Sequence, residues 1–235
     1  MSTDNLFINI ETSTDTCSVA LSRGCEAIDK RENQSRDHAS SLAKYIQELL
    51  ECNNLKVKDL SGVAVSKGPG SYTGLRIGTC TAKGMAYQAG IKFLAIDTLQ
   101  AMALQASKQI TNPDTIICAT IDAGRNEVYS ELFDMKNSSV RQCIAEIITA
   151  DSYSDTLASR PMVFIGNGAE KISKIINHPN AIFMPEIKTS AVYMAELTDK
   201  AFKNNDFADV AYFEPFYLKD YVATVSKKNV LKTAS

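Results

Sequence analysis

The sequence contains few of the residues that bind transition metals or form disulfides. Its two histidines, His38 and His178, lie far apart in the chain, and its six cysteines are dispersed without a CxxC pair. Zinc and iron sites usually need clustered histidines and cysteines, so we expect no metal centre of this kind. Dispersed cysteines are typical of proteins in a reducing compartment, which favours the cytoplasm.

The sequence also lacks long apolar runs and an excess of charge of either sign. No stretch reaches the roughly 20 apolar residues of a membrane span, and we find no secretory signal pattern, so we expect no membrane contact. The net charge of −2 argues against broad electrostatic binding of nucleic acid by this chain alone. We therefore expect any RNA to be shared with another subunit.

What the sequence does contain is a glycine-rich stretch between residues 61 and 90. The Val-Ala-Val run at 63–65 is followed by a turn that starts at Gly68 and by a segment without proline, which predicts strand, loop and helix. A glycine inside a helix costs about 1 kcal/mol relative to alanine, so another backbone should approach closely there. Small residues recur at every fourth helix position, namely Gly74, Gly78, Ala82, Ala86 and Gly90.

This loop does not match the two common phosphate-binding glycine motifs. A P-loop needs Lys and then Ser or Thr after its last glycine, whereas Leu75 and Arg76 follow Gly74. A dinucleotide fingerprint has the spacing GxGxxG, but Gly68, Gly70 and Gly74 are spaced GxGxxxG. A tight turn that lets the helix pack close to a sheet remains an alternative that needs no ligand.

Hydrophobic periodicity predicts two consecutive sets of elements in the same order, βββαβαβα. Strands are predicted at 6–12, 17–23, 26–31, 63–65 and 92–96, and then at 115–121, 127–133, 143–148, 162–166 and 181–183. Helices are predicted at 37–53, with Ser35 or Asp37 as its cap, and at 74–90, 98–109, 152–158, 169–176 and 189–203. The repeat is one of architecture, because the two sets share almost no residues.

Two consecutive βββαβαβ units predict an α/β protein with a duplicated RNase H-like fold, the arrangement of the superfamily of actin, Hsp70 and sugar kinases (ASKHA). We expect an N-terminal domain at 1–110, a C-terminal domain at 111–222 and a polar tail at 223–235. In that superfamily nucleotide lies between the halves, against the first hairpin turn of each. Ordinary hairpin turns have the same composition, so a purely structural role remains open. The candidate nucleotide-cleft residues are Glu11, Thr12, Thr14, Asp15, Asp122, Arg125, Gly166 and Gly168.

Two segments carry a resemblance to a known family. The segment SKGPGSYTGLRIGTCTAKGMA at 66–86 and the segment IETSTDTCSVAL at 10–21 resemble the central signature and the first hairpin of the TsaB (YeaZ-type) family. The likeness continues more thinly through IDAGRNEVY at 121–129, IGNGA at 165–169 and FEPFYL at 213–218. Two departures concern the cleft: Glu11 stands where the family more often has Asp, and Gly124 precedes Arg125 where an Arg pair is common.

The resemblance implies a noncatalytic partner of TsaD, the related subunit that transfers a threonylcarbamoyl group to adenosine beside the tRNA anticodon. TsaD proteins bind metal partly through an HxxxH pair, and the matching place here, residues 96–102, has no histidine. The implied partners are a TsaD-like catalytic subunit, a TsaE-like ATPase, a second copy when the chain is alone, and tRNA only through the complex. No cofactor is expected beyond weak binding of ATP or ADP.

We expect the chain to pair through its first amphipathic helix and the glycine helix, whose small residues would let a partner's helix lie close. For that role the small-residue stripe has to be exposed in the monomer. The candidate partner-interface residues are Leu42, Tyr45, Ile46, Gly74, Gly78, Ala82, Met85 and Ala86.

The alternative function is an ATP-dependent phosphotransferase or nucleotide-binding protein of the same superfamily. Such an enzyme would hold magnesium through carboxylates in the cleft, for which Glu11, Asp15 and Asp122 are the candidates. A protease would need an activated nucleophile or a metal-bound water. The sequence argues against that function, because neither His38 nor His178 stands near a nucleophile elbow or a metal partner.

Overall fold

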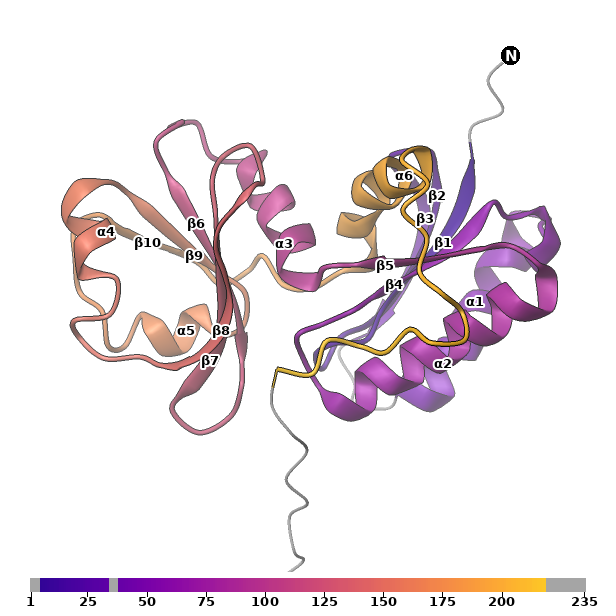
Figure 1. The fold of residues 1–235 in the computed structure, drawn as a ribbon, viewed down its shortest axis with the longest axis horizontal. Coiled ribbons are helices and arrows are strands. Elements are labelled where there is room, and N and C mark those ends of the chain that lie inside the picture. Colours follow the sequence, from indigo (N-terminus) through magenta and orange to yellow (C-terminus); the bar gives the residue numbers. More distant parts are fainter. Residues whose placement is uncertain (1–4, 34–37, 219–235) are drawn as a thin grey trace, which may run out of the picture.

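The structure is a computed structural model in which residues 5–33 and 38–218 are described. The predicted cap at Ser35 or Asp37 and the predicted tail at 223–235 lie outside these residues. The chain forms two α/β halves that lie side by side (Figure 1), each built on a five-stranded mixed sheet. No helix within the described residues combines the length and the apolar character that crossing a bilayer requires.

The first sheet has the strand order β3-β2-β1-β4-β5. Its strands are β1 (Leu6–Glu11), β2 (Cys17–Arg23), β3 (Glu26–Asn33), β4 (Gly62–Ser66) and β5 (Lys92–Ile96). The central strands β1 and β4 are buried along nearly their whole length, since helices cover both faces of the sheet. Helices α1 (His38–Cys52) and α2 (Tyr72–Ala89) pack side by side on one face of the sheet. In the chain, the short 3₁₀ helix η1 (Val57–Asp59) lies between α1 and β4.

The second sheet repeats this arrangement in the order β10-β9-β6-β7-β8. Its strands are β6 (Ile116–Asp122), β7 (Glu127–Phe133), β8 (Ser139–Ile147), β9 (Met162–Ile165) and β10 (Ala181–Met184). The helices that correspond to α1 and α2 are short, α4 (Ser154–Ser159) and α5 (Ala169–Ile172). The repeated order of strands and helices is that of a duplicated RNase H-like fold, so the predicted fold class is confirmed.

The two halves exchange their last helices. Helix α3 (Thr98–Ser107) follows the first sheet in the chain but packs on strands β6, β7 and β9 of the second. The 3₁₀ helix η2 (Ala191–Met194) and helix α6 (Ala195–Lys203) follow the second sheet but pack on the first. An ion pair of 2.7 Å between Lys108 and Glu196 joins the two exchanged segments. The boundary expected at residue 110 therefore separates the strands of the two sheets but not their helices.

The small-residue stripe of α2 faces inward, onto the end of β1. Gly74, Gly78, Ala82 and Ala86 are all buried. A Cβ atom at Gly74 would overlap the backbone oxygen of Thr12, and one at Gly78 would overlap the hydroxyl of Thr12. The expectation of a close backbone approach is confirmed. The expectation that the stripe is exposed is wrong for these four residues and holds for Gly90 alone, which is exposed just after the end of α2. The approaching backbone belongs to the helix's own sheet.

Candidate functional site

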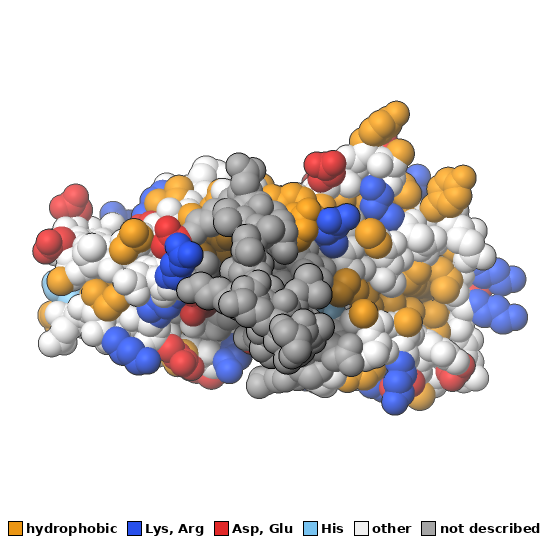
Figure 2. Space-filling view, turned by 90° about the horizontal axis from the view of Figure 1, so that it is seen from below, with side chains coloured by type: hydrophobic (Ala, Val, Ile, Leu, Met, Phe, Trp, Pro, Cys, Tyr) orange, Lys and Arg blue, Asp and Glu red, His pale blue; other side chains and the backbone are white. Residues whose placement is uncertain are grey.

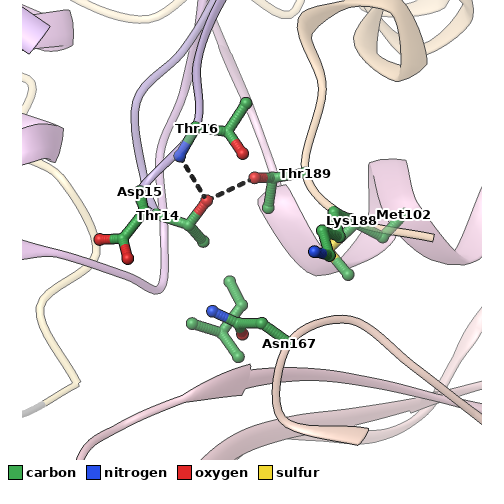
Figure 3. A pocket seen from close by; sticks show the side chains of 8 residues that line it. Thr14, Asp15, Thr16, Met102, Asn167, Lys188 and Thr189 are labelled. Atoms are coloured by element: carbon green, nitrogen blue, oxygen red, sulfur yellow. Dashed lines mark hydrogen bonds between the residues drawn. The ribbon is translucent and has the colours of Figure 1, made fainter. Parts of the chain in front are cut away.

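The candidate site is a cavity of about 210 Å³ between the two halves (Figure 3). A second cavity of about 430 Å³ shares Thr14, Asp15, Ile121 and Asn167 with the first, and extends from there to Gly70, Ser71 and Asp122. The hairpin turns after β1 and after β6 both border this space, as the sequence predicted for a duplicated fold. The residues that line the first cavity are Thr14, Asp15, Thr16, Met102, Ile121, Asn167, Lys188 and Thr189.

The first hairpin turn is held by hydroxyl groups. The Thr14 and Thr189 hydroxyls lie 2.6 Å apart, and the backbone N–H of Thr16 donates to the Thr14 hydroxyl over 3.3 Å (Figure 3). Thr14 is therefore tied to the segment that precedes η2. The neighbouring Asp15 is exposed at the tip of the turn and is among the residues that line both cavities.

The carboxyl group of Glu11 does not reach the cavity, because it is buried beneath the turn with 1% of the residue exposed. Its Oε1 accepts hydrogen bonds from the backbone N–H of Ser13 (2.6 Å) and the hydroxyl of Ser66 (3.0 Å). Burial raises the pKa of Glu11 above its ordinary value, against the effect of these hydrogen bonds. Glu11 therefore joins the turn after β1 to the end of β4 instead of offering a ligand to the cleft.

Thr12, also a candidate cleft residue, is fully buried and faces α2. Its hydroxyl donates to the backbone oxygen of Gly74 over 2.8 Å. The side chain therefore joins β1 to the first turn of α2 and is not among the residues that line the cavities.

In the second hairpin turn, Asp122 lines the larger cavity, but its carboxylate is already bound by other groups of the chain. Its Oδ1 accepts from the Lys171 ammonium over 2.6 Å and from the backbone N–H of Gly124 over 2.7 Å. Arg125 lies further out, exposed and with a left-handed φ of 51°, and it does not line either cavity. A ligand that used the Asp122 carboxylate would have to displace a lysine.

The glycines of the loop between β9 and α5 are explained by packing. A Cβ atom at Gly166, whose φ of 91° is unfavourable for other residues, would overlap the backbone oxygen of Thr120. One at Gly168 would lie 2.8 Å from the Thr120 hydroxyl. The residue between them, Asn167, does line the cavity, and its side-chain oxygen accepts from the backbone N–H of Asp122 over 2.9 Å.

Six of the residues that line the smaller cavity are not among the candidate cleft residues: Thr16, Met102, Ile121, Asn167, Lys188 and Thr189. Met102 and the pair Lys188 and Thr189 come from the segments that cross between the halves, and no pattern in the sequence reveals that exchange. Asn167 stands between the two predicted glycines, so the same loop could have indicated it.

Comparisons with known proteins place this chain in a family. Residues 31–230 match the family described as TsaD: tRNA N6-adenosine threonylcarbamoyltransferase. A Bacillus subtilis protein named tRNA threonylcarbamoyladenosine biosynthesis protein TsaB is 30% identical over 89% of this chain and 92% of its own length. The protein of that name from Haemophilus influenzae is 29% identical over 91% and 93%. The chain belongs to the TsaB (YeaZ-type) family. The predicted resemblance is confirmed.

Solved structures of the family share the fold. YeaZ from Pseudomonas aeruginosa superposes with a TM-score of 0.77 at 22% identity, and the match covers 91% of this chain and all of that one. A further structure, described as an uncharacterized protein with similarity to peptidase YEAZ from Pseudomonas aeruginosa, gives a TM-score of 0.78 at 21% identity. The match covers 92% of this chain and all of that chain. The duplicated architecture is therefore that of YeaZ-type proteins.

The place expected to match the TsaD metal ligands has a structural role in this TsaB-type chain. Asp97 caps helix α3, because its Oδ1 accepts from the backbone N–H groups of Leu99 (3.0 Å) and Gln100 (3.1 Å). Met102 is buried against the second sheet. Residues 5–33 and 38–218 contain no group of three or more His, Cys, Asp or Glu side chains arranged to hold a metal ion.

The expected partner face is largely internal to the monomer. Leu42, Ile46, Ala82 and Ala86 belong to the core beneath α1 and α2, as do the buried glycines of the stripe. Of the eight candidate interface residues, Tyr45 and Met85 are the two that are partly exposed. Hydrophobic side chains nevertheless gather on the surface of this half (Figure 2). The outer surface of α2 consists of other residues, including Ile77, Cys80, Gly84 and Tyr87.

Proposed function

We propose that this chain is the noncatalytic subunit that pairs with a TsaD-like threonylcarbamoyltransferase and supports the modification of adenosine beside the tRNA anticodon. The names of its relatives support this pathway, since they are tRNA threonylcarbamoyladenosine biosynthesis proteins. The matched family, which is described as the transferase itself, supports a TsaD-type protein as the partner.

The proposal that the chain is noncatalytic rests on two of the three candidate carboxylates, which are already bound by other groups of the chain. Phosphoryl transfer in related folds needs carboxylates that hold magnesium beside the phosphates. Here Glu11 is enclosed and hydrogen-bonded to its own loop, and Asp122 is bound to Lys171. Of the three candidates, Asp15 would then have to act without a second carboxylate, and one carboxylate rarely fixes a catalytic magnesium ion. This arrangement disfavours the phosphotransferase alternative.

The surface proposed for pairing is the outer side of α1 and α2, here called the helix face and defined by Tyr45, Ile77, Gly84, Met85 and Tyr87. Tyr87 is 84% exposed, although it is a large aromatic residue. A Cβ atom at Gly84 would meet no atom within 4 Å. An exposed helix with an open glycine and apolar neighbours allows another helix to approach closely.

The remaining parts of the proposal rest on the same family. A TsaE-like ATPase joins the complex, tRNA is reached through the complex, and two copies of the chain pair through the helix face when no other subunit is present. The cleft binds ATP or ADP weakly at most, because neither hairpin turn has successive glycines to wrap a phosphate. The chain acts in the cytoplasm, which agrees with its six free cysteines, all within the described residues.

Size-exclusion chromatography of the chain with the TsaD-like protein of the same organism tests the proposal. The wild type should elute as a one-to-one pair. Gly84→Arg should abolish the pair without unfolding the monomer, because the space around Gly84 is open, and Gly84→Ala is the matched control that should still pair. A wild-type chain that does not pair would overturn the proposed function. A Gly84→Arg variant that pairs normally would overturn the helix face.

A further inference from the structure

A segment near the C-terminus runs along the outside of the first half, beside α2 (Figure 1). We call residues 207–218 the strap. The N–H of Ala208 donates to the oxygen of Phe93 on β5 over 2.9 Å, and the rings of Phe213 and Phe93 have centroids 5.2 Å apart. Strand β5 is one edge of the first sheet, whereas α1 packs on β2 and β3 toward the other edge. The strap therefore lies on the side of α2 that faces away from α1.

A hydrogen-bonded turn that begins at Asp209 forms the middle of the strap. Its Oδ1 accepts from the backbone N–H groups of Ala211 (2.7 Å) and Tyr212 (3.0 Å), and its backbone oxygen accepts from the N–H of Phe213 (2.9 Å). From α2, the Lys83 ammonium donates to the backbone oxygens of Ala211 (3.1 Å) and Phe213 (3.0 Å). The backbone on both sides of Tyr212 is thus fixed to the helix.

This turn presents the Tyr212 side chain to solvent beside the helix face. Tyr212 is 85% exposed, and Tyr87 on α2 is 84% exposed. Lys83, which binds the turn, and Tyr87 are four residues apart and lie on the same side of α2. The turn therefore lies next to the part of α2 that carries Tyr87 and the open position at Gly84. Tyr212 and the helix face form one continuous surface.

A tyrosine on a fixed backbone is suited to anchor a protein interface. Tyrosine is enriched in interfaces and among the residues that contribute most to binding. A side chain whose backbone is already held loses less conformational freedom when a partner binds it. The cation of this turn, Lys83, is engaged by backbone oxygens, and the strap adds the acidic Asp209 and Glu214. This charge favours a protein surface over a polyanion as the partner.

We propose that Tyr212 is an anchor residue for the TsaD-like subunit, which receives the ring in an apolar pocket with a hydrogen-bond acceptor for the hydroxyl. The inference rests on the proposed function, because the strap extends the helix face on which the pairing is proposed. It adds a contact from a segment that lies more than a hundred residues after α2 in the chain. The proposed surface then runs from Tyr45 on α1, across Tyr87 on α2, to Tyr212.

Isothermal titration calorimetry of the full chain with the TsaD-like subunit of the same organism tests the inference. Tyr212→Ala should weaken the pair at least about 10-fold. Its melting temperature should equal that of the wild type, because the side chain is exposed. Tyr212→Phe keeps the ring and should lose less affinity than Tyr212→Ala. The control is Ile147→Ala, on β8 of the second half, where a 61% exposed apolar side chain is shortened and the affinity should stay within about twofold.

Variants of the turn test whether its fixed backbone matters. Asp209→Ala removes the acceptor for two backbone N–H groups and leaves the tyrosine in place. It should weaken the pair about 2- to 10-fold, because Tyr212 then loses more freedom on binding. Asp209→Asn keeps a side-chain oxygen as acceptor and should pair like the wild type.

The outcomes separate this inference from the proposed function. A wild type that does not pair would overturn both. A wild type that pairs, with Tyr212→Ala binding equally tightly or losing no more than Ile147→Ala, would overturn the anchor alone. Sedimentation velocity of the chain alone and binding of tRNA are measured on the same variants. If Tyr212→Ala weakened self-association or tRNA binding while the pair stayed intact, the assignment of Tyr212 to the TsaD-like subunit would be wrong.

Discussion

Each half contains a threonine at or just after the end of its first strand, whose hydroxyl donates to a backbone oxygen and on which two glycines pack. In the first half the Thr12 hydroxyl donates to the backbone oxygen of Gly74 in α2, and Gly74 and Gly78 pack on this threonine. In the second half the Thr120 hydroxyl donates to the oxygen of Ile165 over 2.6 Å, and Gly166 and Gly168 pack on that threonine. The two halves thus share the packing of glycines on a threonine, although the spacing of the glycines and the secondary structure around them differ.

The two halves differ in the length of the helix that comes after these glycines. In the first half the glycines begin an 18-residue helix, which presents an outer surface beside the 15-residue helix α1. In the second half they precede a four-residue helix, and α4 has six residues. A pair of long helices offers ridges and grooves for another helix, whereas two short turns do not. The comparison therefore favours the first half as the proposed pairing surface.

The largest expected effect is the loss of stability when a methyl group is added to a glycine that packs on Thr12 or Thr120. Gly166→Ala should lower the free energy of unfolding by about 3 kcal/mol or more, because overpacking against Thr120 adds to a left-handed backbone. Gly74→Ala should lower the free energy of unfolding by about 1 to 3 kcal/mol. The added methyl group overlaps Thr12, but Gly74 does not have the left-handed backbone of Gly166. Urea denaturation followed by circular dichroism measures both.

Gly84→Ala is the control for these two variants, because it adds the same methyl group to α2 where space is open. It should stabilise the protein by about 0.5 to 1 kcal/mol through higher helix propensity. If Gly74→Ala were as stable as Gly84→Ala, the packing of the stripe against Thr12 would be wrong.

The next effect concerns pairing, and it contrasts equally apolar surface positions in the two halves. Met85→Arg places a charge in the helix face and should weaken binding of the TsaD-like subunit at least about 10-fold, which corresponds to about 1.4 kcal/mol. Ile144→Arg changes a residue on β8 that is 40% exposed and should leave the affinity within about twofold. Isothermal titration calorimetry measures both. A larger loss for Ile144→Arg would move the interface to the second half.

A smaller effect concerns two buried carboxyl groups, Glu11 in the first half and Glu131 in the second. Burial raises the pKa of both above the ordinary value of 4.5. Their protonated forms therefore stabilise the fold fully below about pH 4.5, and this contribution is lost as pH rises through the folded-state pKa. Between pH 5 and 8 the wild type should lose more stability than Glu11→Gln, and the difference for Glu131→Gln should be smaller. Identical pH profiles for the wild type and Glu11→Gln would contradict the enclosed state of that carboxyl.

The smallest effect is expected for nucleotide binding. Calorimetry with ATP and magnesium should give a dissociation constant weaker than about 100 μM, or about −5.5 kcal/mol. Lys171→Ala releases Asp122 from its ion pair, so it should change this weak binding little unless Asp122 acts as a magnesium ligand. A low micromolar constant that Asp15→Ala or Asp122→Ala abolishes would instead support the phosphotransferase alternative.

The sequence predicted the fold well because hydrophobic periodicity and glycine placement are local signals. The order of strands and helices is confirmed, whereas the helix predicted at 169–176 ends at Ile172 and the one predicted at 189–203 begins as the 3₁₀ helix η2. Strand β8 begins at Ser139, earlier than predicted, with polar residues that carry little hydrophobic signal. These differences occur at the ends of elements, where tertiary contacts outweigh propensity.

The site was predicted less completely, because spacing indicates which residues share a face but not which face is covered. The stripe of Gly74, Gly78, Ala82 and Ala86 fits an exposed interface or a buried contact equally well, and Thr12 decides between them. The exchange of α3 and α6 brings Met102 and Thr189 to the cavity over distances in sequence that no local pattern spans. Glu11 and Asp122 were located near the cleft, but their partners Ser13 and Lys171 depend on side-chain geometry.

Reconstituted tRNA modification tests the central claim, a noncatalytic subunit that acts by pairing, most directly. The TsaD-like subunit and the remaining components are supplied with wild-type, Asp15→Ala, Asp122→Ala, Gly84→Ala or Gly84→Arg chain, and threonylcarbamoyladenosine is measured in the tRNA. The account predicts activity near that of the wild type for both aspartate variants and for Gly84→Ala, and at least about a 10-fold loss for Gly84→Arg. Loss of activity in Asp15→Ala or Asp122→Ala while the pair still forms would contradict it, because the cleft would then take part in the chemistry.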